Sequence, residues 1–129
     1  MLNTEGLITK LRNIIADGTT LALTDVYSPE LPATGDNKCA VTILGGQPLN
    51  NLCGVESFDI TGRIIIRGSV NDTTTRNLVD SIYNTINLKN NTTFESSKII
   101  QIIAQIPVFI GKDEDLRNLY NITFRIKEK

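Results

Sequence analysis

The chain has 129 residues, with 13 Lys and Arg, 14 Asp and Glu and no His, so its formal net charge is -1. This length suits a single domain over residues 1–129, and the balanced charge supplies no positive field for binding nucleic acid as a main role. The lack of His removes the commonest general base, the Ser–His and Cys–His nucleophile pairs and the usual nitrogen ligand of zinc, so we expect neither an enzyme nor a cofactor-binding protein.

The N-terminal third predicts a helix, a strand and a loop. In "TEGLITKLRNIIADG", apolar residues recur at helical spacing and Gly18 follows as a stop signal, which predicts a helix over residues 4–18. Residues 19–27 are rich in β-branched side chains and predict a strand. Residues 28–38, "SPELPATGDNK", contain two Pro and a Gly, which favours a long exposed loop.

The middle of the chain predicts two strands and a second helix. "CAVTIL" suggests a short strand that ends at a second loop over residues 45–54, "GGQPLNNLCG". "ESFDITGRIIIRGSV" alternates cleanly and predicts an apolar face with the members Phe58, Ile60, Ile64, Ile66 and Val70. Its other face is polar apart from Ile65. "NDTTTRNLVDSIYNTIN" then predicts an amphipathic helix capped by Asn71 or Asp72.

The last third predicts two further strands. "KIIQIIAQI" places Ile100, Ile102, Ala104 and Ile106 on one face, and residues 120–126 alternate apolar and polar side chains. The stretch between them, "PVFIGKDEDLR", combines "PVFIG", which we expect to anchor a turn in the core, with charged residues. The order of elements is not a strict strand–helix alternation, so it predicts an α+β fold, an antiparallel or mixed sheet with two helices packed on one face.

Several polar groups were weighed as chemical sites. Asp113, Glu114 and Asp115 could attract a metal ion, but their contiguous spacing lacks the distribution of a calcium loop, and a solvated turn or interface rim is the ordinary explanation. "LGGQPL" lacks the Lys-Ser/Thr ending of a phosphate loop. Nothing in the sequence brings two of the other loop carboxylates together for acid–base chemistry.

A basic sheet face is a further candidate. Arg63, Arg67, Arg125 and Lys127 all fall on predicted polar strand faces, and neighbouring strands would gather them into a patch able to contact phosphates or an acidic partner. The alternative is a solvated face balanced by Glu56 and Asp59.

The two cysteines and the hydropathy bear on location. Cys39 and Cys53 could form a disulfide, but buried thiols are expected in an intracellular chain. No window reaches the roughly 18 apolar residues of a membrane span, and no export signal pattern is present at the start, so we expect no membrane association and no export.

The loops point to contacts with other chains. They take a large share of a small chain and carry no evident chemistry. The sheet must also have edges, which an oligomer can pair or cover. The contact candidates in the two long loops are Pro29, Glu30, Pro32, Asp36, Lys38, Gln47, Asn50 and Asn51. The subunit-interface candidates in the last turn are Gly111, Lys112, Asp113, Glu114, Asp115 and Arg117.

The whole pattern resembles the tail terminator proteins of long-tailed bacteriophages and phage-like tail particles, often labelled minor capsid proteins. The features that carry the resemblance are the opening helix through "LRNIIAD", the strand "GRIIIRGSV" with the helix "TRNLVDSIYNTI", and the closing run "PVFIGKDEDLRNLYNITFRI". The closing motif of the family corresponds to Pro107, Gly111, Asp113 and Arg117.

The resemblance implies a structural virion protein, assembled in a bacterial host cytoplasm, that forms a hexameric ring on the tail tube, ends tail polymerisation and provides the docking surface for the head connector. Its implied partners are copies of itself, the tail tube protein and a connector or collar protein, with the tail sheath as a further candidate and DNA only as passing cargo. The alternatives are another head–tail neck protein, such as a stopper or completion protein, and a small domain that contacts nucleic acid through the basic sheet face.

Overall fold

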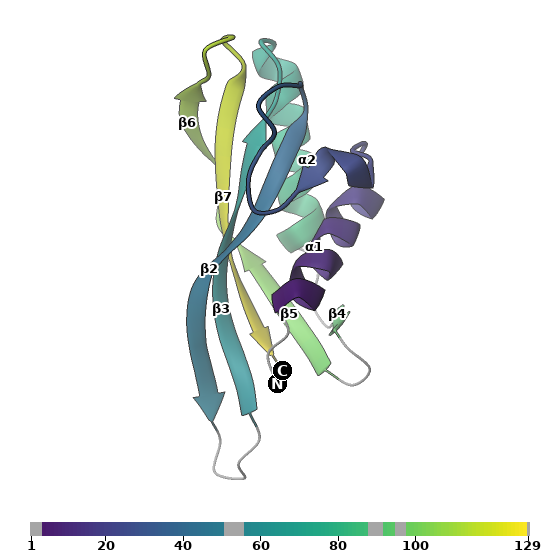
Figure 1. Cartoon of the computed structure of the whole chain (residues 1–129), viewed down its shortest axis with the longest axis vertical. Coiled ribbons are helices and arrows are strands. Elements are labelled where there is room, and N and C mark those ends of the chain that lie inside the picture. Colours follow the sequence, from purple (N-terminus) through teal and green to yellow (C-terminus); the bar gives the residue numbers. More distant parts are fainter. Residues whose placement is uncertain (1–3, 51–55, 88–91, 95–97, 129) are drawn as a thin grey trace.

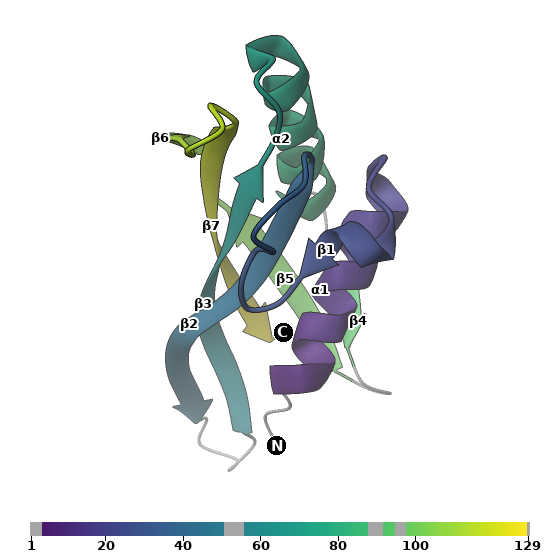
Figure 2. The ribbon, with the colours of Figure 1, turned by 45° about the horizontal axis from the view of Figure 1, so that its top comes forward.

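The computed structural model describes residues 4–50, 56–87, 92–94 and 98–128. Two helices, α1 (Thr4–Gly18) and α2 (Asp72–Asn87), pack on one face of a mixed sheet (Figures 1 and 2). The described strands are β1 (Val26–Tyr27), β2 (Lys38–Asn50), β3 (Glu56–Arg67), β4 (Thr92–Phe94), β5 (Lys98–Ala104), β6 (Val108–Lys112) and β7 (Asn118–Glu128). The predicted α+β class is confirmed.

The sheet is built around β7. Its strand order is β1-β2-β3-β7-β5-β4, and β6 pairs separately with β7. β3 lies along one edge of β7, from Asp59 to Arg67, while the other edge is shared, since β5 pairs with the later residues of β7 and β6 with the earlier ones. All pairings are antiparallel except that of β1 with β2.

The core lies between the helices and the sheet. The predicted helical stripes are buried, with Leu7, Leu11 and Ile15 on α1 and Leu78, Val79, Ile82 and Ile86 on α2. They pack on apolar side chains of the sheet face that β3, β5 and β7 present to them. Asn71 caps α2, because its Oδ1 accepts a 2.8 Å hydrogen bond from the Thr74 N–H.

The strand predicted over residues 19–27 is wrong for most of its length. Leu23–Asp25 forms a short 3₁₀ turn and only Val26–Tyr27 pairs as β1. The turn is closed locally, because the Ala22 N–H donates to the Asp25 carboxylate (3.1 Å) and the Asp25 N–H donates to the Ala22 carbonyl (2.9 Å). A carboxylate that can bond to nearby backbone competes with strand pairing.

The loop predicted over residues 45–54 is wrong in its first half. β2 continues to Asn50 and stays paired with β3, with a bulge at Leu44, between Ile43 and Gly45. Gly45 has φ +139°, a conformation that favours glycine and lets the strand bend. Pro48 is compatible with this strand because β2 lies toward an edge, where a missing N–H donor costs little. Residues 51–54 lie outside the described part.

Other predictions for the second half of the chain are also corrected. Val70 and Ile106 are exposed, because both lie just beyond the strands whose alternation was extended to them. Thr92–Phe94, for which no strand was predicted, pairs with β5 as β4. The segment "PVFIG" does not anchor a turn in the core, since Val108, Phe109 and Ile110 are 57%, 50% and 51% exposed.

Candidate assembly surfaces

The acidic turn between β6 and β7 is closed by its own side chains. The Asp113 Oδ1 accepts hydrogen bonds from the N–H groups of Asp115 (3.0 Å) and Arg117 (2.9 Å). The Arg117 Nε donates to the Asp113 Oδ2 (2.8 Å), and the Arg117 Nη2 donates to the Asp115 Oδ2 (3.1 Å). Burial raises the pKa of the Asp113 carboxyl, but the bonds from Arg117 and Asp115 outweigh it and hold that pKa below its usual value.

This arrangement divides the predicted interface residues into two groups. Asp113 and Arg117, which is only 8% exposed, bind each other within one chain and shape the turn. Glu114, Asp115 and Leu116 are exposed at its tip. Leu116 has φ +63°, a strained conformation for a branched side chain. The interface role predicted for the turn stays a prediction, and its outward groups are the ones that a neighbour could contact.

Gly111 and Lys112 lie at the start of the same turn. Gly111 has φ +130° and belongs to a bulge in β6, and the Lys112 Nζ lies 3.8 Å from an Asp72 carboxylate oxygen at the N-terminus of α2. Both of these groups are largely exposed, so this ion pair adds little to stability.

The strand β6 is an exposed apolar edge. Phe109 packs edge-to-face on Tyr120 of β7, with ring centroids 5.4 Å apart, and this is the one ring contact found among the described residues. Val108 and Ile110 remain about half exposed, and Ile106, just before the strand, is 77% exposed. A run of large apolar side chains in contact with water is typical of a surface that another chain covers.

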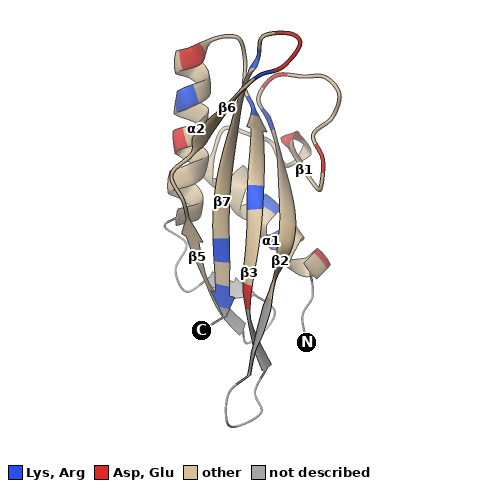
Figure 3. Ribbon diagram, turned by 90° about the vertical axis from the view of Figure 1, so that its left-hand side faces the viewer, with Lys and Arg blue, Asp and Glu red and all other residues tan. Residues whose placement is uncertain are grey.

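The basic sheet face is only partly assembled. β3 and β7 are neighbours, as the patch requires, and Figure 3 shows Lys and Arg positions along both strands in blue. The alternation of buried and exposed residues places Arg63, Arg125 and Lys127 on the face of the sheet opposite the helices, here called the open face. Arg125 forms an ion pair with Asp59 on the adjacent strand. The alternative of a face balanced by acidic neighbours therefore holds for Arg125, and the positive charge is weaker than four cations would give.

Arg67 does not belong to the solvated patch. Its side chain is on the open face but only 6% exposed, because the loop of residues 28–37 folds across it. The Arg67 Nε donates to the Gly35 carbonyl (2.9 Å) and its Nη1 to the Pro32 carbonyl (2.7 Å). Burial, and then the nearby Arg117 cation, lower the pKa of the Arg67 guanidinium. Arg67 is therefore the tether of the loop.

The loop predicted as exposed is consequently held at several points. The Pro29 carbonyl accepts a bond from the Thr42 hydroxyl (2.8 Å), and Lys38 forms an ion pair with Asp25. Asp36 lies 3.7 Å from the Arg117 guanidinium.

Of the other contact candidates, two lie on a described strand, one lies in the loop and one lies outside the described residues. Glu30 projects into solvent from the loop. Gln47 and Asn50 belong to the backbone of β2, and Asn51 lies outside the described residues.

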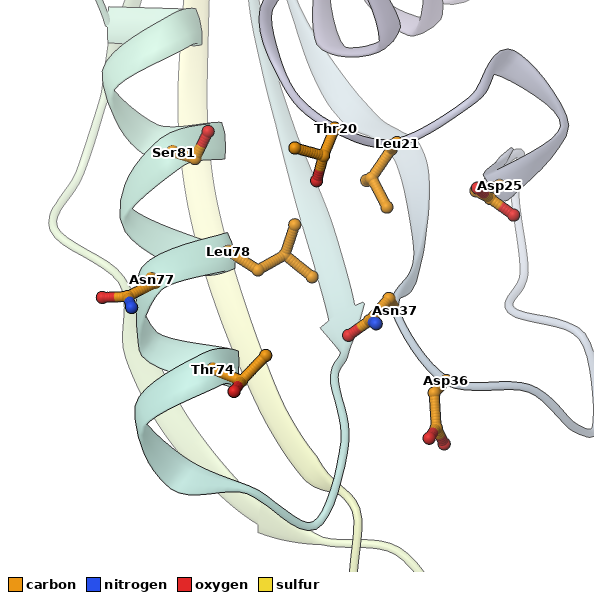
Figure 4. Close-up of a pocket in the computed structure, with 9 residues that line it drawn as sticks. All are labelled: Thr20, Leu21, Asp25, Asp36, Asn37, Thr74, Asn77, Leu78 and Ser81. Carbon is orange, nitrogen blue, oxygen red and sulfur yellow. The ribbon is translucent and has the colours of Figure 1, made fainter.

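A groove between α2 and the segment around Leu21 and Asn37 was not predicted (Figure 4). It has a volume of about 480 Å³. Its α2 side is formed by Thr74, Asn77, Leu78 and Ser81. The buried Asn37 Oδ1 has no hydrogen-bond partner among the described residues. The sequence carries no signal for this groove, because small polar residues on a helix are the ordinary pattern of a solvated surface.

Two other tests concern metal binding and membranes. Within the described residues, no group of three or more Cys, Asp and Glu side chains is placed to hold a metal ion. In the same part of the chain, neither helix has the length and apolar character that crossing a membrane requires.

The buried Cys39 is a free thiol, and burial raises its pKa to about 12. It therefore stays protonated and unreactive at neutral pH. Cys53 lies outside the described residues.

Comparison with known proteins gives structural similarity without sequence similarity. Neither the family models nor the curated proteins yield a match. A solved chain from the "Virion of native gene transfer agent (GTA) particle" is similar with a TM-score of 0.65 at 9% sequence identity, and the alignment covers 92% of this chain and 83% of that one. At such low identity, the match shows that the two chains share a fold over nearly the whole of this one.

Proposed function

We propose that this chain is a structural protein of a phage-like virion, and that within the virion it is the tail terminator. It forms a ring on the finished tail tube, ends tube polymerisation and presents the surface to which the head connector docks. It is not an enzyme and needs no cofactor. Its partners are further copies of itself, the tube protein and the connector.

The observation that carries this proposal is the shared fold with a chain of a gene transfer agent virion. The sequence resemblance to tail terminators, found independently of that match, points in the same direction. The surfaces support a role in assembly: one small domain presents an apolar edge at β6, an acidic turn tip directly after it and a partly neutralised basic face.

A ring suits these surfaces physically. Each contact between neighbours is small, but closure makes every subunit bind at two places at once, and the linked contacts reinforce each other through effective concentration. The loops that contact tube and connector lose conformational freedom on binding, and a loop already tied to the sheet, as residues 28–37 are through Arg67, loses less.

The test combines mass with tail length. Purified protein, alone and mixed with tail tubes, is examined by native mass spectrometry and electron microscopy, and tails are measured from cells in which the gene is deleted. We expect assemblies several times the 14.2 kDa mass of one chain, rings at tube ends, and tails of unregulated length without the gene. A protein that stays monomeric and does not bind tail tubes would refute the proposal, as would tails of normal length after deletion of the gene. Headless tails of normal length would indicate a stopper instead.

A further inference from the structure

The described sheet has free edges at β6 and along part of β2, besides that of the three-residue β4 at the end of the strand order. β6 has one strand neighbour, β7, so the backbone groups along its other side are unpaired within the described residues. On the opposite side of the sheet, β1 covers β2 only at Cys39 and Ala40.

Beyond β1, the loop covers two more residues of β2. The Ser28 hydroxyl donates to the Val41 carbonyl (2.7 Å), and the Thr42 hydroxyl donates to the Pro29 carbonyl (2.8 Å). From Ile43 to Asn50, no described strand lies on the outer side of β2. Besides β4 and the end of β5, the free stretches of the described sheet are therefore β6 on one side and the second half of β2 on the other.

The two edges share an unusual local feature. Each contains a bulge in which a large apolar residue precedes a glycine with positive φ: Leu44 with Gly45 (φ +139°), and Ile110 with Gly111 (φ +130°). Leu44 and Ile110 are 53% and 51% exposed. Solitary proteins commonly protect a free edge with inward charges or a cover. Here both edges offer an apolar side chain at the bulge.

The strand directions fit edge-to-edge pairing of successive copies. β6 is antiparallel to β7, β7 to β3, and β3 to β2, so β6 and β2 run in opposite directions within one sheet. A rotation about an axis parallel to the strands preserves these directions. It would bring β6 of one copy against β2 of the next as an antiparallel pair, the more stable arrangement. Because the two edges differ, such a contact is heterologous and can close a ring.

The charges near the two edges are complementary. The turn that follows β6 exposes Glu114 and Asp115, which are acidic. Arg63 is exposed on β3 directly beside Thr42 of β2, next to the receiving edge. Pairing of β6 with β2 of a second copy would bring the acidic tip toward Arg63 of that copy. A β6–β6 contact between two copies would not bring the acidic tip to Arg63. The charge pattern therefore selects a second copy in head-to-tail orientation as the occupant.

We propose that the subunits of this protein are joined by β6 of one copy adding to the outer edge of β2, from Ile43 onward, in the next copy, with the acidic tip of the first against Arg63 of the second. The proposal rests on the ring of the proposed function and names its interface. The result is one sheet that continues from subunit to subunit.

Cross-linking tests the pairing directly. In a Cys53→Ser background, where the remaining Cys39 is buried, the double variant Leu44→Cys/Ile110→Cys is treated with a bismaleimide that spans about two strand spacings, or roughly 10 Å. We expect a ladder of covalent multimers on a denaturing gel. Each single variant should stay monomeric. Dimers from Ile110→Cys alone would show a symmetric β6–β6 contact and overturn the proposal.

A charge placed on the edge gives a second readout. Val108→Lys adds a cation to an exposed position of β6, so folding should be unaffected while assembly weakens at least tenfold in native mass spectrometry. The control is Leu23→Lys, which charges an exposed apolar residue of the 3₁₀ turn, outside β6 and the free part of β2, and should assemble normally. Equal assembly of the two variants would refute the role of β6.

The two proposals fail in distinguishable ways. If wild-type rings form and terminate tails, but the double cysteine variant gives no ladder, the edge pairing is wrong and the proposed function stands. If the ladder forms but tails lacking the protein have normal length, the pairing stands and the terminator role is wrong. A wild-type protein that remains monomeric at all concentrations overturns both.

Discussion

Replacing Arg67 by methionine should release the loop of residues 28–37 from the sheet. The guanidinium donates two hydrogen bonds to loop carbonyls, those of Pro32 and Gly35, from a nearly buried position at the end of β3. Methionine keeps a long flexible side chain and much of the packing against the loop, but it offers no donor. The substitution therefore tests the two hydrogen bonds separately from the packing of the side chain.

The expected loss of stability follows from opposing effects. Hydrogen bonds to charged groups contribute about 1.5–3 kcal/mol each, so the two bonds represent about 3–6 kcal/mol. Removing the cation also removes two costs, the burial of a charge whose Nη2 has no partner among the described residues and its repulsion from Arg117. The relief of such costs commonly offsets a large part of the loss. We expect the free energy of unfolding to fall by about 1–3 kcal/mol.

Urea unfolding and limited proteolysis measure the two consequences. With a slope of about 2 kcal/mol per molar urea, the midpoint should fall by about 0.5–1.5 M. Cleavage after Glu30 by a glutamate-specific protease, identified by mass, should accelerate under native conditions. Arg63→Met, on the same strand but exposed, is the control and should change stability by less than about 0.5 kcal/mol. An unchanged midpoint and a loop that stays protected in Arg67→Met would refute the tether.

Three further outcomes follow from the structure. The hydrogen bond from Lys38 outweighs desolvation and lowers the pKa of Asp25. The ion pair therefore stabilises the fold above the unfolded pKa of about 3.9, and this stabilisation is lost as the pH falls below that value. Asp25→Asn should flatten the acid side of a stability–pH profile. In a Cys53→Ser background, Ellman's reagent should label Cys39 only at the rate of unfolding, and rapid labelling in native buffer would contradict its burial. Gly62→Ala should lower stability by about 1–3 kcal/mol in thermal melts, because the added Cβ would lie 2.4 Å from the nearest ring atom of the buried Phe124. An unchanged Tm would contradict that contact.

The parts of the fold that could be predicted depend on residues close together in the chain. The stripe containing Leu11 and Ile15 predicts α1, and the alternation around Ile64 and Ile122 predicts β3 and β7, because one buried face suffices to fix the period of each element. The sequence predicted a basic face only if β3 and β7 were neighbours, without showing that they were. The structure pairs the two strands and so gathers part of that face.

The errors arise where distant segments decide the environment. Arg67 follows the polar alternation of β3, but a loop more than thirty residues earlier in the chain covers it. Pro48 and Gly45 are turn residues in isolation and become strand residues beside β3, near an edge. Phe109 and Ile110 have the composition of a core segment, yet among the described strands β6 has a neighbour on one side only. No local pattern distinguishes such an edge from a buried strand.

The central position of β7 also orders the events of synthesis. This strand joins β3 to β5 and β6, and it follows every other described strand in the chain. While the ribosome is still translating residues 118–128, α1 and the ribbon of β2 and β3 have already been made, but β6 has no partner to align it. The β6 half of the surface that we assign to subunit contact therefore gains its supporting strand only when β7 is made, later than the β2 half.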